Sequence, residues 1–303
     1  MTSLPSRDPG AAIKSALKRE VNFGCPVRFP DGTGCGCPVL TYHHFDPPWV
    51  GNFVHNPDGM IALCKWHHDL ADGGGFTMAQ LRAMKRAPYV DDAVKVQWPY
   101  SPETLVVKIS KSLVIGDGSP IRLNTKPILA FRPEPIEAIG GRTVVFDADI
   151  RDAAGNPWLT INDSWFDLRL AATTDVAFPP QARTLIARHS DSTFISLRHR
   201  RMRFGEIGAW LSTFLDKQEM VHSGPSSIKG ANAIDSDGMV PILELEGHFR
   251  TADVEVRILG NEMVFRSFIP GMEEEFPFHS WIVNGTNRVR LLRPDKSEFF
   301  SLG

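Results

Sequence analysis

The first 90 residues alternate between segments in which apolar side chains recur with a helical period and short runs of consecutive apolar residues. In residues 8–20 apolar side chains return every three or four positions, which predicts an amphipathic helix. Residues 65–72 can form a second helix, which stops at three consecutive glycines. A capping-box pair predicts a third helix over residues 77–86, because Pro88 excludes a longer one.

Two apolar runs in the same region predict strands. Residues 39–45 form the first and residues 60–63 the second, and a proline-rich loop separates them. The glycine-, proline- and cysteine-rich residues 22–38 are too irregular for a helix or a long strand. The predicted order is therefore strand, loop, strand, helix.

From about residue 105 the pattern changes to short alternating segments broken by turn residues. In residues 144–150 an apolar side chain stands at every second position, at Val144, Phe146, Ala148 and Ile150. Residues 254–268 and 281–292 each place two such segments around a two-residue turn, which predicts two β-hairpins. One helix is expected over residues 205–217. The pattern as a whole predicts an α+β protein whose C-terminal part is mostly antiparallel β.

The chain of 303 residues is long enough for two domains. The proline-containing residues 89–102 predict the boundary. We therefore expect a first domain over residues 1–95 and a β-rich domain over residues 96–303 that serves selectivity, regulation or assembly. A further break is expected near residues 223–238, where Ser, Gly and Asp accumulate.

The composition is that of a folded globular protein, with 42% hydrophobic and 22% charged residues. These fractions exclude a disordered or fibrous chain. No apolar run reaches the length of a membrane helix, and the first residues lack the features of a secretion signal, so we expect a cytoplasmic protein without a membrane partner. The net charge of -2 restricts any nucleic-acid contact to local patches.

All four cysteines and five of the ten histidines lie in one short stretch of the chain. A disulfide framework is disfavoured, because the rest of the chain has no cysteine and nothing indicates an oxidising compartment. Cys64 and His67 are three positions apart at a predicted strand-to-helix turn, a spacing typical of zinc knuckles. Cys25 and Cys35 can complete a structural Zn2+ site, with Cys37 as the alternative to Cys35. Four ordinary buried cysteines are the competing interpretation.

The remaining histidines of the stretch suggest a second group with different chemistry. His43 and His44 end the first predicted strand, so their rings point to opposite faces. His68 follows the zinc pair on the predicted helix, and Asp72 lies one turn further on the same face. Imidazole and carboxylate donors suit a harder cation than thiolates do.

Four segments of this region occur in the order and spacing of a known family: Phe-Gly-Cys-Pro at 23–26, Cys-Gly at 35–36, Tyr-His-His-Phe-Asp-Pro-Pro-Trp at 42–49, and the segment 55–68 that ends in Cys-Lys-Trp-His-His. Together they resemble bacterial HNH endonucleases, over residues 21–86. The resemblance implies a ββα-metal fold and hydrolysis of phosphodiester bonds. The order of elements read from the apolar pattern agrees with that fold.

The resemblance also implies residue roles. It makes His44 the general base, and it makes His43 and His68 ligands of a catalytic divalent cation. Asp72 occupies the position of a further ligand in some members, and an oxygen ligand suits Mg2+ or Mn2+. A neutral imidazole with a pKa near 6.5 can take a proton from water at neutral pH. The cation would neutralise the phosphate and the departing 3'-oxygen.

The chain departs from the family pattern at two places. The family asparagine lies nine residues before the closing histidine, where this chain has Gly59, and Asn56 lies three residues earlier. We expect Asn56 to take the catalytic role of orienting His44 or its loop, with an ordinary Asn-Pro turn as the alternative. Residues 27–34 look like an insertion between the first two cysteines.

The charge distribution offers little general affinity for nucleic acid. Residues 1–95 hold 10 Lys and Arg against 9 Asp and Glu, a net charge of +1, and the remainder holds 23 against 26. Binding would then depend on local groups of basic side chains. In the alternative interpretation these side chains only form solvent-exposed helix faces. The candidate phosphate contacts are Lys14, Lys18, Arg19, Arg82, Lys85 and Arg86, and the densest basic run in the β-rich part is residues 198–203.

Three functions compete at this point. The first is a metal-dependent endonuclease that cuts double-stranded DNA and, by analogy only, serves in defence against foreign DNA. The second is a zinc-stabilised nucleic-acid-binding module without catalysis. The third assigns the main function to the β-rich part, as a ligand sensor or a homo-oligomer that restrains the nuclease.

Overall fold

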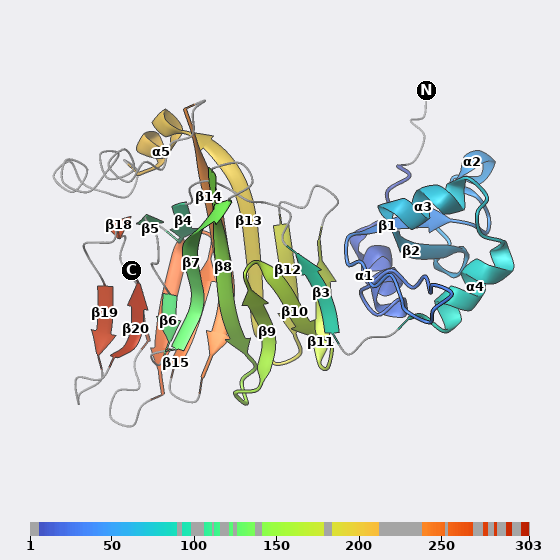
Figure 1. The fold of residues 1–303 in the computed structure, drawn as a ribbon. Coiled ribbons are helices and arrows are strands. Elements are labelled where there is room, and N and C mark those ends of the chain that lie inside the picture. The colour runs from blue at the N-terminus through green and yellow to red at the C-terminus, as the bar shows by residue number, and fades with distance from the viewer. Residues whose placement is uncertain are drawn as a thin grey trace. The chain divides into compact units, whose positions relative to one another are not determined.

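The computed structural model has a mixed, strand-rich fold that divides into two compact units (Figure 1). The N-terminal unit comprises Met1–Val96 and Asp167–Ala187, and the β-rich unit comprises Gln97–Phe166 and Arg188–Gly303. The structure describes residues 6–89, 93–97, 106–110, 112–115, 121–123, 126–136, 141–178, 184–211, 238–251, 254–268, 275–277, 282–283, 289–292 and 298–302. The predicted break at 223–238, all but its last residue, and parts of the predicted boundary at 89–102 lie outside these residues.

The N-terminal unit is built around one pair of antiparallel strands. Strand β1 pairs with β2 from Leu40 opposite Cys64 to His44 opposite Met60. Helix α3 follows β2 without a loop and contacts both strands, so the predicted order of strand, loop, strand, helix is observed. The elements of this unit are α1 (Ala11–Glu20), β1 (Leu40–His44), α2 (Trp49–Asn52), η1 (Pro57–Gly59), β2 (Met60–Cys64), α3 (Lys65–Asp72), α4 (Met78–Arg86), β3 (Ala93–Gln97) and β11 (Thr173–Ala177).

Two of the three predicted helix ends agree with the structure, and one differs. Helix α3 ends before Gly73, as the glycine run predicts, and α4 begins with a complete capping box between Thr77 and Gln80. Helix α1 begins at Ala11 rather than at residue 8. Its N-cap is Gly10, which offers no side-chain oxygen to the first turn.

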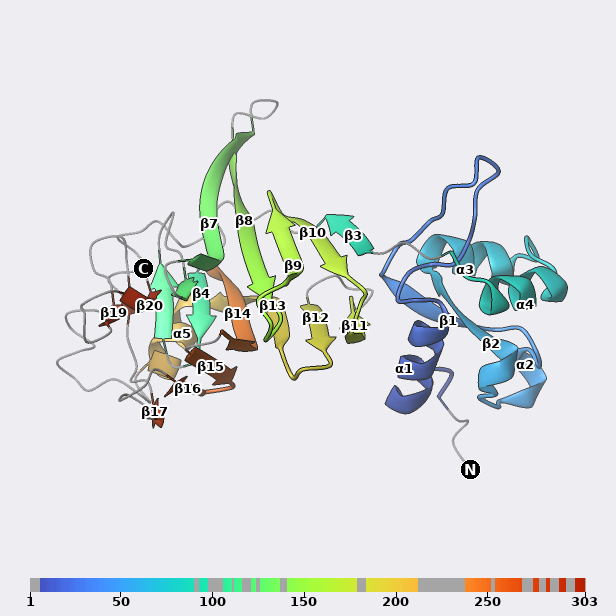
Figure 2. The same cartoon turned by 90° about the horizontal axis from the view of Figure 1, so that it is seen from below.

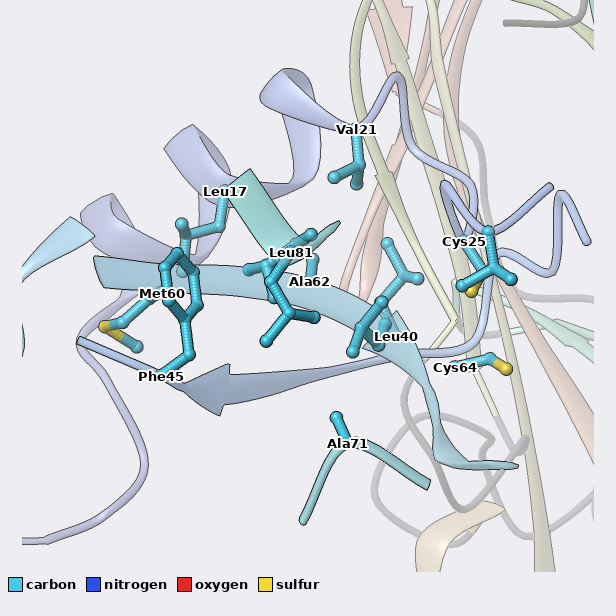
Figure 3. Packing of buried hydrophobic residues seen from close by; sticks show 13 residues of the cluster. Leu17, Val21, Cys25, Leu40, Phe45, Met60, Ala62, Cys64, Ala71 and Leu81 are labelled. Carbon is cyan, nitrogen blue, oxygen red and sulfur yellow. The ribbon is translucent and has the colours of Figure 1, made fainter. Parts of the chain in front are cut away.

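The core of the N-terminal unit lies on both faces of the strand pair. All five residues of β2 are buried. Figure 2 shows α1 on one side of the strand pair and α3 on the other. In Figure 3, Leu17 and Val21 pack against the pair from the side of α1, and Ala71 packs against it from α3. Burying each large apolar side chain contributes roughly 1.5–3 kcal/mol. Packing against the helices therefore stabilises the strand pair more than its own few hydrogen bonds do.

Lys18 and Arg19, which the sequence suggested as phosphate contacts, make contacts within the protein. The ammonium group of Lys18 pairs with Asp175 and donates to the carbonyl of Val176 at 2.8 Å, and Arg19 donates to the carbonyl of Thr174 at 3.2 Å. These contacts dock β11 on α1 within the N-terminal unit. Lys18 is only 9% exposed, and Asp175 is its counter-charge.

Lys85 has the same kind of role at the other end of the hairpin. Its ammonium group pairs with Glu20 and donates to the carbonyls of Pro57 and Met60 at 2.8 and 3.1 Å. It therefore joins α1, α4 and the start of β2. Lys85 therefore has a structural role within the protein, which differs from both roles considered from the sequence.

The β-rich unit contains two sets of strands, which run in the orders β19-β20-β6-β7-β8-β9 and β13-β14-β15-β16-β17. Most pairs are antiparallel, but β4 pairs with β14 and β5 pairs with β18 in parallel. The boundary between the two units falls within β10 (Trp165–Arg169) and β12 (Thr184–His189). The other elements are β4 (Val106–Ile109), β5 (Ser112–Ile115), β6 (Ile121–Leu123), β7 (Lys126–Ile136), β8 (Gly141–Arg151), β9 (Pro157–Asn162), β13 (Phe194–Arg203), α5 (Phe204–Leu211), β14 (Met239–Arg250), β15 (Val254–Leu259), β16 (Glu262–Ser267), β17 (Glu275–Pro277), β18 (Ile282–Val283), β19 (Val289–Leu292) and β20 (Glu298–Leu302).

One of the two predicted hairpins is confirmed and the other is wrong. Strands β15 and β16 pair around Gly260 and Asn261, as the turn dipeptide predicts. In the described residues β18 and β19 form no pair with each other: β18 pairs with β5, and β19 pairs with β20. The predicted turn between them lies outside the described residues, as does the end of the helix expected at 205–217.

None of the helices in the described part of the chain combines the length and the apolar character that a membrane span requires.

The pairing of Lys18 with Asp175 leads to a prediction about stability. Asp175→Asn should lower the free energy of unfolding by roughly 1–3 kcal/mol, because it leaves the ammonium group of Lys18 buried without a counter-charge. The double variant Lys18→Met with Asp175→Asn should recover most of this loss. Urea unfolding followed by tryptophan fluorescence would measure both. Equal stability of the single variant and the wild type would show that the pair is dispensable.

Candidate functional site

A small hairpin brings the first two cysteines of the cluster together. The amide of Cys25 donates to the carbonyl of Cys37 at 3.0 Å, and the amide of Cys35 donates to the carbonyl of Val27 at 2.8 Å. Residues 28 and 34 form a bridge, and the ring of Phe29 in the loop between them lies 6.1 Å from that of His67. The segment 27–34 therefore lengthens the hairpin without separating Cys25 from Cys35.

Four donor atoms from this hairpin and from the β2–α3 junction lie within 4.8 Å of one another. The sulfurs of Cys25 and Cys64 each lie 3.3 Å from Nδ1 of His67, and the sulfurs of Cys35 and Cys64 are 3.8 Å apart. A tetrahedral Zn2+ with bonds of about 2.3 Å to sulfur and about 2.0 Å to nitrogen needs separations of roughly 3.8 Å between sulfurs and 3.5 Å between sulfur and nitrogen. The cluster could therefore hold a metal ion such as zinc.

Cys37 is not a member of that group of four. The sequence left Cys35 and Cys37 as alternatives, and the geometry favours Cys35. Hydrogen bonds from the sulfurs of Cys25, Cys35 and Cys37 hold the pKa of Cys64 far below its usual range. Hydrogen bonding to Cys35 and Cys64 correspondingly raises the pKa of Cys25. A metal cation bound to these sulfurs would replace the protons that they share in hydrogen bonds.

A second group of donors lies on the other side of the β1–α3 contact. His43, His68 and Asp72 offer one ligand atom each, all within 4.8 Å. Nδ1 of His43 lies 2.9 Å from one oxygen of Asp72, and Nδ1 of His68 lies 3.6 Å from the other. The two imidazole rings are perpendicular, with centroids 5.4 Å apart. Burial lowers the pKa of His43, although the carboxylate of Asp72 opposes this effect, and a neutral imidazole is the form that binds a cation.

A charged side chain, Arg7, and a cavity lie next to this group of donors. A guanidinium nitrogen of Arg7 lies 3.4 Å from Asp72. A cavity of about 720 Å³ borders His68 and Arg7 and is lined also by Tyr42, Lys14 and Phe178. One member of the donor group, His68, therefore borders a space that combines aromatic and cationic side chains.

His44, the neighbour of His43 on β1, belongs to a separate set of contacts. Its Nε2 lies 3.0 Å from Nδ1 of His55, and Nε2 of His55 lies 3.0 Å from the carbonyl oxygen of Ser6. The indole ring of Trp49 stacks on His55, with centroids 4.8 Å apart and an angle of 27°. His43 and His44 thus make different contacts, as their alternation along a strand predicts.

The imidazole of His44 is neutral at physiological pH. Burial, together with the neighbouring His55 and Arg7, lowers the pKa of His44 to about 4. His44 is 4% exposed, and among the described residues nothing hydrogen-bonds its Nδ1. A buried nitrogen with a free lone pair is costly, and such atoms in proteins call for a ligand or water.

The hydrogen bonds of Asn56 go to the loop and not to His44. Its amide nitrogen donates to the carbonyl of Asp46 at 3.4 Å, and its amide oxygen accepts from the backbone of Asp58 at 3.3 Å, where it caps η1. A side chain at Gly59 is excluded, because its Cβ would lie 1.4 Å from the carbonyl oxygen of Asp46. The close approach of that backbone explains why an asparagine is absent here.

The six candidate phosphate contacts are mostly engaged within the protein. Besides Lys18, Arg19 and Lys85, Lys14 pairs with Asp8 and Arg82 pairs with Asp46. Arg86 is exposed. Five of the six candidates therefore bond within the protein, and their binding to phosphate stays a prediction.

Sequence reasoning assigned no role to four residues that surround the two histidine groups: Ser6, Arg7, Trp49 and His55. The one available signal was the position of His55 inside the stretch rich in cysteine and histidine. The others are ordinary residues whose contribution depends on contacts across the fold.

The cysteine cluster makes a direct prediction. Cys64→Ser should release about one zinc ion per chain and unfold the N-terminal unit, because the long loop before β1 has few other contacts to hold it. Cys37→Ser is the matched control and should keep both metal and fold, since Cys37 lies outside the group of four. Elemental analysis and circular dichroism would measure the two effects. Zinc loss from the Cys37 variant alone would mean that Cys37, and not Cys35, is the fourth ligand.

Comparison with known proteins adds no further support for either cluster. No protein-family model, no curated protein and no solved structure matches the chain. The interpretation of the site therefore rests on its own geometry and on the resemblance of the short motifs described above.

Proposed function

We propose that the N-terminal unit is a metal-dependent endonuclease of the HNH type that hydrolyses phosphodiester bonds of double-stranded DNA. One observation supports this most directly. Three cation donors, His43, His68 and Asp72, lie on a strand pair and the helix that follows it, and the next residue of the same strand, His44, is a neutral base with a free nitrogen. A general base beside a cation site is the combination that hydrolysis of a phosphodiester requires.

In this proposal His44 accepts a proton from water while the water oxygen forms a bond to phosphorus. The bond between phosphorus and the 3'-oxygen breaks, and the leaving oxygen takes a proton from solvent. His43, His68 and Asp72 would hold the divalent cation, which supplies positive charge to the phosphate and the leaving oxygen when it is bound. Two imidazoles and one carboxylate suit Mn2+ better than Mg2+, which prefers oxygen ligands.

The β-rich unit is assigned selectivity, regulation or assembly, in which a ligand or a second copy of the chain would take part. Its sequence carries no net positive charge that would bind DNA broadly. A role in defence against foreign DNA is an analogy with other nucleases of this type.

A nucleic-acid-binding module without catalysis is the second candidate, and a specific observation favours it. His44 is buried, and a guanidinium nitrogen of Arg7 lies 3.4 Å from Asp72, so the base is covered and a cation would compete with Arg7 for the carboxylate. Catalysis would require Arg7 to leave Asp72 when the cation binds, and water and substrate to reach His44. A binding module would have no such requirement.

Substitutions of the histidines test the first candidate against the second. With Mn2+, the wild type should nick supercoiled plasmid, and His44→Ala should reduce the rate by roughly 100- to 10,000-fold with unchanged zinc content. His43→Ala and His68→Ala should instead raise the Mn2+ concentration needed for activity. Asp58→Asn, a substitution at an exposed residue, is the control and should leave the rate unchanged. A wild-type protein that binds DNA but cuts neither DNA nor RNA would favour the second candidate.

The depressed pKa of His44 predicts the shape of the pH profile. A general base works in its deprotonated form, so activity is lost as pH falls through the pKa of the base. Since burial lowers that pKa to about 4, the rate at saturating Mn2+ should stay nearly constant from pH 8 to about 5.5 and fall only below that. Half-maximal activity near pH 6.5 would show that His44 titrates as an ordinary exposed histidine.

A further inference from the structure

We propose that His55 is a positioning residue that fixes the tautomer and the ring orientation of His44. This inference rests on the proposed function, in which His44 is the general base. His55 lies on the loop before η1 and reaches His44 across the space between that loop and the end of β1, where their rings are 5.2 Å apart.

The direction of each hydrogen bond follows from the one partner whose role is unambiguous. The carbonyl oxygen of Ser6 can only accept, so Nε2 of His55 carries a proton and donates to it at 3.0 Å. A neutral His55 then has a lone pair on Nδ1. That lone pair accepts the proton of Nε2 of His44, again at 3.0 Å. In a neutral His44 the remaining nitrogen, Nδ1, is therefore unprotonated.

The free nitrogen of His44 is the atom that the proposed reaction needs. Nδ1 is buried and accepts no hydrogen bond from the described residues, so its lone pair is not consumed by the protein. Asp72 does not compete for this role, because its hydrogen bond goes to His43. Asn56 does not supply it either, because its amide contacts the loop.

Packing keeps the two rings from turning. Trp49 stacks on His55 and lies with its ring centroid 5.0 Å from that of His44, and Phe53 packs edge-on against Trp49. Trp49 is itself buried. A half-turn of the His44 ring would break the bond to His55 inside this aromatic cluster, so the arrangement selects one orientation of the base.

Two substitutions of His55 separate orientation from packing. His55→Gln keeps an acceptor for His44 and a donor for Ser6, whereas His55→Phe keeps a ring to stack on Trp49 but offers neither. Nitrogen NMR of the full chain labelled with ¹⁵N-histidine at pH 7.5 would report the tautomer of His44, with its signals assigned by comparison with His44→Gln. Circular dichroism and zinc content would establish that each variant is folded.

The wild type and His55→Gln should show the Nε2-protonated form of His44, and His55→Phe should show a mixture of tautomers. With Mn2+ and plasmid DNA, His55→Phe should lower kcat by roughly 10- to 100-fold with little change in KM, and His55→Gln should restore most of kcat. Protonation of His44 on Nδ1 in the wild type, or an unchanged tautomer and kcat in folded His55→Phe, would overturn the inference.

The NMR result does not depend on cleavage. A chain that shows the expected tautomers but cuts no nucleic acid would therefore contradict the proposed function and still establish that His55 orients His44.

Discussion

The antiparallel register of β1 and β2 is the constraint on which both candidate sites depend. With Leu40 opposite Cys64, the end of β2 lies beside the start of β1, and α3 begins at the next residue. This junction directs Cys64 and His67 toward the cysteine hairpin on one side and His68 and Asp72 toward His43 on the other. A shift by one residue would exchange the faces of His43 and His44 and dismantle the second group. The buried apolar residues that cover both faces of the hairpin therefore determine where the chemistry can occur.

Metal ligation and core packing would both be needed to stabilise a unit as small as the N-terminal one. The cysteine hairpin contains glycines that allow close backbone contact, and a Cβ at Gly24 would lie 2.9 Å from the carbonyl oxygen of Gly36. Backbone of this kind has a large conformational entropy when unfolded, and a core this small offsets little of it. Ligation of a cation by Cys25, Cys35, Cys64 and His67 would supply the missing stabilisation. The ammonium groups of Lys18 and Lys85 add to it by joining α1 to β11 and α4 to η1.

Short-range signals could be predicted from the sequence, and long-range partners could not. The end of α3, the capping box of α4 and the turn between β15 and β16 depend on a few neighbouring residues, and the pattern identified them. The partner of Lys18 lies 157 positions away, and the parallel pairing of β18 with β5 joins distant segments. No local propensity encodes such contacts. The same limit applies to the site: the residue types and spacings of the ligands were readable, but the contact between His44 and His55 depends on how the loop folds.

Gly59, the main departure from the motif that the chain resembles, is compatible with the proposed role of His44. Two amides, those of Phe45 and Asp46, donate to the carbonyl of Gly59, which brings the backbone after β1 too close for any side chain at this position. The tight turn excludes an asparagine but also fixes the end of β1, and with it the place of His44. The orienting hydrogen bond can then come from another residue that the same loop carries, and His55 meets that requirement in both distance and hydrogen-bonding direction. In the proposed mechanism the base requires an acceptor at a defined position, and His55 would supply it with an imidazole in place of an amide.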